Sequence, residues 1–386
     1  MGPLTGLKVI EIASIGPGPY CGMLLADLGA EVIRVGRIET PFDSASGGLL
    51  RGRQTLEVDL KQPQGVEIVR RLIRSADAAF EGFRPGVAER LGIGPEVCLA
   101  DKPSLVYGRM TGWGQEGPLA NSVGHDINYV ALSGALHGIG RPGGKPVVAQ
   151  NYLGDFGGGG MLLAFGMLAA LLHARQTGEG QVVDAAMVDG AAQLTTGYHA
   201  MLASGLYDDG TGTSFLGGAA HFYDTYETRD GKYVSVGAIE PHFYAEFIER
   251  LGLDPQVFAP HGFRFEVDDD VQAAWTELKP LVAAAFARKT RDEWCELLEG
   301  SDVCFAPVLS LSEVADHPHH RARNAFVKVG DHLQPAPAPR FSGTRPDDPR
   351  ESVLADPASL LAAAGLDEAE IQGALESGAV GDKRRS

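Results

Sequence analysis

Three features that mark particular protein classes are scarce or missing in this sequence of 386 residues. The four cysteines, Cys21, Cys98, Cys295 and Cys304, form no CxxC pair, so we expect buried thiols rather than a metal or redox motif. The longest apolar run, residues 161–172, has twelve residues, too few to span a bilayer. Acidic side chains outnumber basic ones by 50 to 33, which disfavours nucleic acid as a partner. We therefore expect a soluble globular protein.

A targeting pattern is also missing at the start of the sequence. The stretch "MGPLTGLKVIEIA" passes quickly into strand-like residues, without the basic and apolar regions of a signal peptide. We accordingly expect a cytoplasmic protein. Hydrophobic residues make up 44% of the chain and charged residues 22%, a composition typical of folded domains, and the length fits two or three of them.

The acidic excess lies outside residues 1–110, which carry thirteen basic and thirteen acidic side chains. The first third of the chain is thus the place for an anionic ligand. Ordinary surface charge remains the alternative for each basic residue taken alone. The candidates are Arg34, Arg37, Arg51, Arg53, Lys61 and Arg84.

The first 35 residues predict a βαβ unit, with "LKVIEIA" and "EVIRV" as strands and "GPYCGMLLADLG" as the helix. The loop "IGPGPYCG" resembles a dinucleotide fingerprint but places Cys21 where the third glycine belongs. An acidic residue is also missing at the end of the second strand, where Arg34 and Arg37 suit a phosphate better than a ribose diol. The pattern favours a nucleotide other than NAD.

Alternating strands and helices continue to about residue 200 and predict an α/β fold with a mostly parallel sheet and ligands at the strand ends. After residue 215 the hairpin "HFYDTYETRDGKYVSVGAI" and two helical stretches predict a small α+β domain. A Pro-rich extended linker, a helix over 367–378 and a frayed "DKRRS" tail follow. Further strands are predicted at "TLEVDL", "AAFEGF" and "SLVYGRM", and further helices at "QPQGVEIVRRLIRSAD", "MLLAFGMLAALL", "PHFYAEFIERLGL" and "TRDEWCELLEG".

Several long motifs coincide with one family. They are "GPGPYCGMLLADLGAEVIRV", "VDLKQPQG", "EGFRPGVAERLG", "RMTGWGQEGP", "GHDINY", "LGDFGGGG", "GQVVDAAMVDG" and "VGAIEP". On these motifs the chain, from about residue 4 to about residue 340, resembles the α-methylacyl-CoA racemase branch of the family III CoA-transferases (CaiB/BaiF type). The resemblance implies racemisation of 2-methylacyl-CoA thioesters through an enolate.

The same resemblance implies an architecture. It consists of a large Rossmann-like domain over residues 1–200, a small α+β domain over 215–320, and a C-terminal segment, 321–386, that returns to the large domain. Two chains are expected to interlock as a homodimer with CoA at the interface. CoA is then part of the substrate, and we expect no separate cofactor and no metal.

Two side chains suit the chemistry. Moving a proton from one face of the α-carbon to the other requires two acid/base groups and stabilisation of an enolate oxyanion. His125 in "GHDINY" offers an imidazole, which exchanges protons near neutral pH. Asp155 precedes a glycine run, which we expect at the start of a helix, with backbone N–H groups facing the enolate oxygen and glycines that let the thioester approach.

Each candidate has an ordinary alternative. Asp155 would otherwise be a helix N-cap and His125 a satisfied core histidine. Asp126, next to His125, is expected to be structural because neighbouring residues on a helix point in different directions. Glu240 in "VGAIEP" is a loop-surface carboxylate by default, whereas the resemblance makes it the acceptor that fixes the tautomer of the catalytic histidine.

The resemblance also implies a CoA site. Arg37 would bind the phosphates, the segment of residues 58–61 and Arg84 would surround the nucleotide, and the "GHDINY" motif would lie near the pantetheine and thioester. The segment and the motif comprise Val58, Asp59, Leu60, Lys61, Gly124, His125, Asp126, Ile127, Asn128 and Tyr129. Residues 217–221 depart from the Asp-Gly-Gly-Ala-Pro of related racemases, beside the expected acyl pocket. There we expect His221 to cap the hairpin.

Two rival functions stay open. In a CoA-transferase of this family, Asp155 would attack the acyl-CoA as a nucleophile. An aromatic residue generally stands at the position of His125 in such transferases, which favours the isomerase here. A nicotinamide dehydrogenase or a non-catalytic nucleotide-binding module would share the βαβ start, but the broken glycine pattern and the His, Asp and Glu motifs disfavour both. The preferred acyl chain is left open.

Overall fold

The structure is a computed structural model that describes residues 2–38, 48–265 and 268–381. The expected frayed tail, residues 382–386, lies outside the described residues. The chain divides into two compact units. Unit 1 contains Met1–Ser133, Gln150–Gln193 and Arg321–Ser386, and unit 2 contains Gly134–Ala149 and Leu194–His320. The expected bounds placed residues 134–149 with the large domain, whereas their hydrogen bonds run to unit 2, for instance from Thr211 Oγ1 to the carbonyl of His137.

Unit 1 is built on a seven-stranded sheet of order β12-β3-β2-β1-β4-β5-β6 in which all neighbouring strands are parallel. The expected α/β fold is therefore confirmed. The strands are β1 (Lys8–Ile12), β2 (Glu31–Gly36), β3 (Gln54–Glu57), β4 (Ala78–Glu81), β5 (Val106–Thr111), β6 (Gln181–Ala186) and β12 (Val353–Leu354). The sequence predicted β1 to β5 within a few residues, because their apolar runs are buried on both faces.

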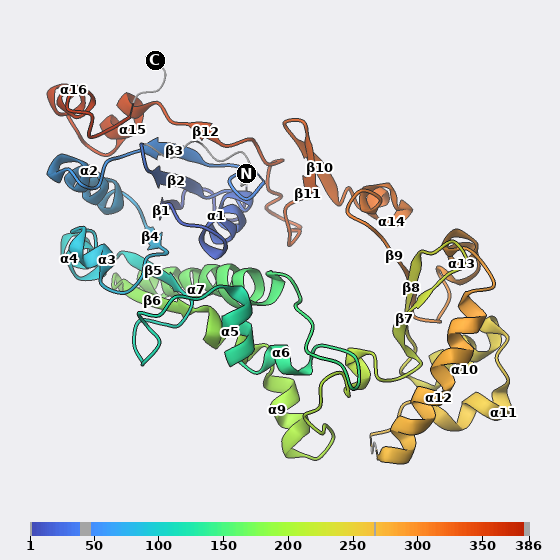
Figure 1. Ribbon diagram of the computed structural model, residues 1–386. Coiled ribbons are helices and arrows are strands. Elements are labelled where there is room, and N and C mark those ends of the chain that lie inside the picture. Colours follow the sequence, from blue (N-terminus) through green and yellow to red (C-terminus); the bar gives the residue numbers. More distant parts are fainter. Residues whose placement is uncertain (1, 39–47, 266–267, 382–386) are drawn as a thin grey trace. The chain divides into compact units, whose positions relative to one another are not determined.

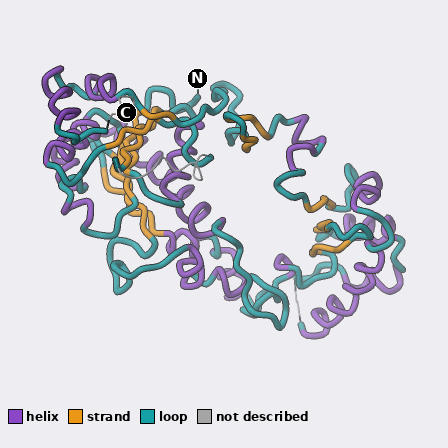
Figure 2. The backbone as a smooth tube through the Cα atoms, turned by 45° about the horizontal axis from the view of Figure 1, so that its top comes forward, coloured by secondary structure: helices purple, strands orange, loops and turns teal. Residues whose placement is uncertain are grey.

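Helices cover both faces of this sheet (Figures 1 and 2). Along β1 the side chains alternate: Ile10 and Ile12 pack into one core with α2, while Val9 packs into a second core with α1 and α7. The helices of unit 1 are α1 (Pro17–Asp27), α2 (Pro63–Arg74), α3 (Val87–Arg90), α4 (Pro95–Asp101), α5 (Asp126–Leu132), α7 (Leu162–Thr177), α8 (Met187–Gln193), α15 (Pro357–Ala363) and α16 (Glu368–Glu376). Pro63 occupies the first turn of α2, as predicted.

A π-helical segment, η2 (Tyr152–Met161), runs directly into α7. The continuous stretch from Tyr152 to Thr177 is long and apolar enough to cross a membrane by length and composition. Its packing is that of a core helix, because Leu163, Met167 and Leu171 are buried against the sheet. Phe165 on another face of α7 is 71% exposed in the single chain.

The C-terminal segment returns to unit 1. The strand β12 pairs with β3, and the amide of Asp59 donates to the carbonyl of Ala379. A small hairpin precedes it, consisting of β10 (Phe326–Val329) and β11 (His332–Pro335), after α14 (Pro318–Ala322). Arg51 donates to Gln334 and to the carbonyl of Pro335 in this hairpin.

Unit 2 contains a three-stranded antiparallel sheet of order β7-β8-β9. The predicted hairpin is present as β7 and β8, and Gly231 in its turn has φ of +73°. The elements are α6 (Ala135–Gly138), α9 (Thr196–Ala203), η3 (Phe215–Gly217), β7 (Tyr223–Glu227), β8 (Tyr233–Gly237), α10 (Pro241–Leu251), α11 (Pro255–Phe258), η4 (Ala259–His261), α12 (Asp269–Phe286), α13 (Arg291–Leu298), β9 (Phe305–Val308) and η5 (Val314–Asp316).

Candidate active site

The carboxyl ends of the parallel strands gather the residues that the sequence singled out. Arg37 follows β2, Lys61 follows β3, Arg84 follows β4, and the segment with His125 follows β5. Because parallel strands end at one edge of a sheet, these residues share that edge. The strand order reverses between β1 and β4, and this switch point is where ligands of open α/β sheets bind.

The basic candidates of the first third differ in their surroundings. Arg34 Nε lies 3.9 Å from Glu11 Oε1, and the Arg34 side chain is 18% exposed. Arg51 forms an ion pair with Asp27 at 2.5 Å, and Arg53 forms one with Glu11 at 2.5 Å, and all four side chains are buried. They are structural groups, neither surface charges nor ligand contacts. Arg37, Lys61 and Arg84 are exposed instead.

The segment after β3 is ordered by its own side chains. The Asp59 carboxylate accepts hydrogen bonds from the amide of Lys61 at 2.9 Å and from the side chain of Gln62 at 3.1 Å. These bonds lower the pKa of Asp59. Val58 bridges to Val380, so the returning C-terminal segment fixes this loop at the edge of the sheet.

Asp155 lies in the first turn of η2, where the sequence placed it ahead of a helix. Its Oδ2 accepts a hydrogen bond from the side chain of Asn151 at 3.1 Å. A Cβ added to Gly16 would lie 3.0 Å from the same oxygen, so the carboxylate faces the loop after β1. Burial raises the pKa of Asp155, and the hydrogen bond from Asn151 opposes this shift. A carboxyl group with a raised pKa at the carboxyl edge of a parallel sheet is suited to proton transfer.

His125 is the N-cap residue of α5, and it is exposed. Its amide donates to Asn128 Oδ1 at 3.1 Å, which fixes the first turn of the helix. The charge of His125 lowers the pKa of Asp155, so the two side chains lie within electrostatic range. His125 and Asp155 are 30 residues apart in the sequence, and a hydrogen bond from the Asp155 amide to Asp126 joins the two segments that carry them.

Tyr129 completes the inner side of this group. Its ring packs edge-on against Trp113, with ring centroids 4.7 Å apart. Burial raises the pKa of Tyr129, the charge of Asp155 adds to the shift, and Arg84 opposes it. Arg84 therefore lies within electrostatic range of the Tyr129 hydroxyl group.

The glycine run has a different role from the one that the sequence suggested. A Cβ on Gly158 would lie 2.6 Å from the amide nitrogen of Ala191 in α8, and one on Gly159 would lie 3.0 Å from Pro17 in α1. Gly160 likewise packs against Pro17 and Cys21. These three glycines are buried inside the π-helix, not at its start. They permit close packing against α1 and α8, so the expectation that they admit the thioester is wrong for them.

Glu240 belongs to unit 2, where it is exposed and forms the N-cap of α10. Its charge raises the pKa of Cys304, after the larger effect of burial. Cys304 is itself exposed and Cys295 is partly so, whereas Cys21 and Cys98 are buried. The expectation of four buried thiols is therefore wrong for the two in unit 2.

His221 is fully buried in unit 2, so the expectation that it caps the hairpin is wrong. Tyr244 Oη donates to the carbonyl of Phe258 at 2.8 Å, and therefore accepts from His221 Nε2–H at 2.7 Å. Nδ1 of His221 is then an acceptor, and it has no hydrogen-bond partner among the described residues. Burial lowers the pKa of His221 to about 3.

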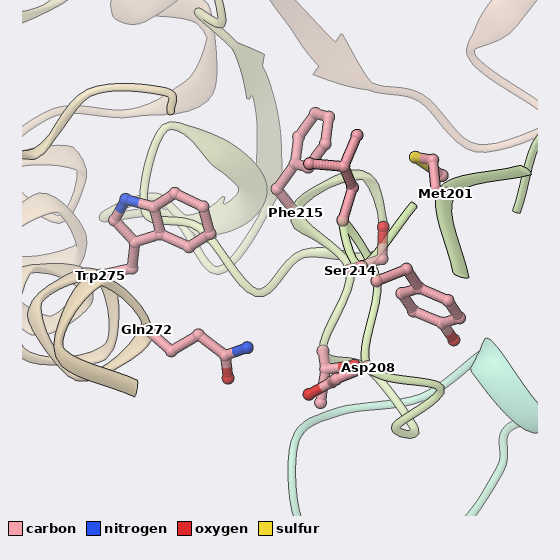
Figure 3. A pocket seen from close by; sticks show the side chains of 10 residues that line it. Met201, Asp208, Ser214, Phe215, Gln272 and Trp275 are labelled. Atoms are coloured by element: carbon pink, nitrogen blue, oxygen red, sulfur yellow. The ribbon is translucent and has the colours of Figure 1, made fainter. Parts of the chain in front are cut away.

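A small pocket in unit 2 is lined by residues from α9, from the segment 205–215 and from α12 (Figure 3). Asp208 and Ser214 line the pocket from the loop between α9 and η3, and Gln272 and Trp275 line it from α12. Its volume of about 50 Å³ suits ordered water rather than an acyl chain. A larger groove, about 640 Å³, runs between α10 and residues 255–264.

Comparison with known proteins defines the family. Residues 4–357 match CoA-transferase family III. The chain belongs to this family. It is 44% identical to an alpha-methylacyl-CoA racemase of Mus musculus over 343 residues, which cover 88% of this chain and 87% of the relative. It is 42% identical to the alpha-methylacyl-CoA racemase of Homo sapiens over 342 residues, with 88% and 87% covered.

A solved structure of the same family agrees with the fold. A CAIB/BAIF family protein from Brucella suis superposes with a TM-score of 0.76 at 26% identity, covering 92% of this chain and 96% of that one. The family resemblance drawn from the motifs is thus confirmed.

Sequence reasoning missed the contacts that hold Asp155 in place. Asn151 and Gly16 both approach the Asp155 carboxylate, and the Asp126 carboxylate accepts a hydrogen bond from the Asp155 amide at 2.7 Å. Gly16 begins the motif "GPGPYCG", and Asn151 lies just before the motif "LGDFGGGG". Only the packing of α5 and the π-helix determines which of their atoms meet. The hydrogen bond from the Asp155 amide is a local contact that the Asp126 side chain makes within unit 1.

Proposed function

We propose that the chain is a racemase of 2-methylacyl-CoA thioesters, an isomerase that moves the α-proton from one face to the other. The observation that carries the proposal is the meeting of His125 and Asp155 at the strand-end edge where Arg37, Lys61 and Arg84 are exposed. The two relatives named alpha-methylacyl-CoA racemase support the same substrate class.

The proposed reaction has two proton transfers. Asp155 removes the α-proton of one enantiomer, the electron pair moves onto the thioester oxygen as an enolate, and His125 delivers a proton to the opposite face. The reverse direction exchanges the two roles. The raised pKa of Asp155 favours this use because an effective acid/base group titrates near the working pH.

The enolate oxygen requires hydrogen-bond donors. The amide of Asp155 is occupied by Asp126, so the remaining amide groups in the first turn of η2, at the positive end of a helical stretch that reaches Thr177, are the proposed donors. CoA enters with the substrate, and the proposed proton transfers use side chains alone.

The proposed CoA site follows the sheet edge. The order β3-β2-β1-β4-β5 places Lys61 and Arg37 at one end and the His125 segment at the other. With strands about 4.8 Å apart, the edge from β3 to β5 spans about 19 Å, which suits an elongated nucleotide thioester. The nucleotide and phosphates lie toward Val58–Lys61 and Arg37, and the thioester lies toward Gly124–Tyr129, with Arg84 between them.

We also propose a homodimer in which Glu240 of one chain fixes the His125 tautomer of its partner. Apolar side chains at the end of η2 and on α7 support this dimer. Met161, Phe165 and Leu172 are all at least half exposed in the single chain, and a second copy would bury them. We further propose that the protein is cytoplasmic and that it acts in fatty-acid and lipid metabolism.

The rival function is CoA transfer with Asp155 as nucleophile, which the family's own description supports. The two are separated by incubating the protein with 2-methylacyl-CoA in D2O. The proposed racemase incorporates deuterium at the α-carbon and scrambles its configuration without an acceptor acid. Transfer of CoA to free succinate or oxalate, without α-deuterium, would establish the transferase instead.

A further inference from the structure

One side chain links the two segments that carry His125 and Asp155. Asp126 is the first residue of α5, directly after His125, and its Oδ1 accepts a hydrogen bond from the amide of Asp155 at 2.7 Å. A single carboxylate thus ties the first turn of α5 to the first turn of η2.

The neighbouring sequence is shaped around this link. A Cβ on Gly154 would overlap Asp126 Oδ1, and it would also press on Val130 of α5. Glycine at 154 therefore lets the carboxylate reach the amide of the next residue. The "HD" of "GHDINY" and the "GD" of "LGDFGGGG" are two halves of one contact.

We propose that Asp126 is a positioning residue for the reaction: its carboxylate, which accepts from the Asp155 amide, fixes His125 relative to Asp155 and adds a negative charge near the Asp155 carboxyl group. This inference rests on the proposed function. It assigns Asp126 a task through Asp155, in place of the direct CoA contact that the family motif implies.

The electrostatic effect follows from the geometry. Burial is the largest cause that raises the pKa of Asp155, and the negative charge of Asp126 raises it further. The hydrogen bond from Asn151 and the charge of His125 lower it. Removing the negative charge at position 126 must therefore lower the pKa of Asp155. Helices α1, α5, α7 and α8 and strands β5 and β6 all pack on η2. Their other ionisable side chains are Tyr20, Cys21, Asp27, Tyr107, Arg109, Tyr129, His173, Arg175, Asp184 and Asp189.

Two substitutions separate the link from the charge. Asp126→Asn keeps an oxygen that accepts from the Asp155 amide but removes the charge, whereas Asp126→Ala removes both. Asp101→Asn is the matched control, because it removes a carboxylate that pairs with Arg70 at the end of α4. Thermal unfolding checks that each variant is folded.

The measurement is α-proton exchange of each 2-methylacyl-CoA enantiomer in D2O across a pH series. For the enantiomer that Asp155 deprotonates, Asp126→Asn is expected to shift the acid limb of the rate profile to lower pH, with KM unchanged and the plateau rate nearly kept. Asp126→Ala is expected to lose roughly 10²-fold in kcat for both enantiomers, the usual cost of a misplaced reacting group. Asp101→Asn leaves the profile unchanged.

Opposite outcomes overturn the inference. An acid limb that stays in place in Asp126→Asn removes the electrostatic role, and a raised KM with unchanged kcat makes Asp126 a ligand contact. Titration of the Asp155 carboxyl by ¹³C NMR gives the same comparison without substrate. Absence of exchange in the unchanged protein would reject the proposed function, whereas an Asp155 titration that does not move in Asp126→Asn would reject the positioning role.

Discussion

At the scale of single residues, Asp155 combines a half-buried carboxylate, a hydrogen bond from Asn151 and two nearby charges of opposite sign. Burial dominates the balance and raises the pKa of Asp155. His125, in contrast, is exposed at the N-cap of a short helix, where a substrate can reach it. In the proposed two-base reaction, a half-buried carboxyl group and an exposed imidazole would thus act on the same thioester.

Arg37 is the residue at which CoA binding is most simply tested. Its exposed guanidinium follows β2, and a phosphate contact of this kind stays the same during proton transfer. Arg37→Ala is therefore expected to raise the KM for acyl-CoA by at least about tenfold, the size of a charge-assisted hydrogen bond, with kcat nearly unchanged. Steady-state kinetics measures both constants.

Arg74→Ala is the control for this prediction, because Arg74 is an equally exposed arginine in the last turn of α2, at the other edge of the sheet. A large loss of kcat at constant KM in Arg37→Ala would remove Arg37 from the phosphate site.

Residue types and motif positions predicted the candidates, but not their surroundings. The basic residues Arg51 and Arg53 looked the same as Arg37 in the sequence, yet each has a buried acidic partner. Those partners, Asp27 and Glu11, are distant in the chain, so only the packing of β1, α1 and the loop before β3 identifies them. His221 shows the same limit, because its burial depends on α10.

At the scale of elements, the glycine run is the clearest case of local sequence serving tertiary packing. Gly158 allows η2 to approach the backbone of α8, where a Cβ would meet the amide of Ala191. Gly158→Ala is expected to destabilise the protein by about 1–3 kcal/mol, as overpacked cores do. Thermal or urea unfolding measures the loss.

Gly197→Ala is the matched substitution in α9, where a Cβ meets nothing within 4 Å. It is expected to be neutral or to stabilise the helix by up to about 1 kcal/mol. Equal unfolding midpoints for the two variants would contradict the packing role of the run.

Burial of His221 between the hairpin and α10 predicts a pH dependence. The pKa of His221 is about 3 in the folded state and 6.5 in the reference state, so the unfolded chain binds more protons between these values. Stability is therefore lost as pH falls below 6.5, by about 2 kcal/mol at pH 5 relative to pH 7. Urea unfolding followed by fluorescence reports it, because Trp275 and Trp294 are buried in unit 2.

His221→Phe removes the titrating group and is expected to reduce the loss between pH 7 and pH 5 by that amount. His242→Phe, a change at an exposed histidine of α10, is expected to keep the full loss. The linkage would be refuted by a His221→Phe protein that loses as much stability as the unchanged chain.

Strands and amphipathic helices were predictable because their burial pattern repeats along the chain. The strand at "EVIRV" and the helix that begins at Pro63 lie within a few residues of their predicted positions. The π-helix was not predictable from the sequence, because its extra residue per turn follows from contacts of η2 with α1 and α8 rather than from apolar periodicity. Strand β12, with two residues, gave too short a pattern to detect.

At the scale of the whole molecule, the proposed dimer joins unit 1 of one chain to Glu240 of another. The exposed apolar face of α7 is the surface that a partner would cover. Asp155→Ala chains and Glu240→Ala chains, each inactive alone, are expected to recover activity when refolded together, because one of the two sites in each mixed dimer is intact. Activity assays on tagged, purified heterodimers measure the recovery. Heterodimers that remain inactive would contradict a shared site.

The central claim is that His125 and Asp155 act on opposite faces of one enolate. Single-turnover exchange in D2O, started from each pure enantiomer, tests it most directly. His125→Ala is expected to lose racemisation by roughly 10²-fold or more, while Asp155 still exchanges deuterium into its own enantiomer without inversion. Asp155→Ala shows the mirror pattern. If His125→Ala instead racemises both enantiomers at nearly the full rate, the two-base account is wrong and nucleophilic attack by Asp155 replaces it.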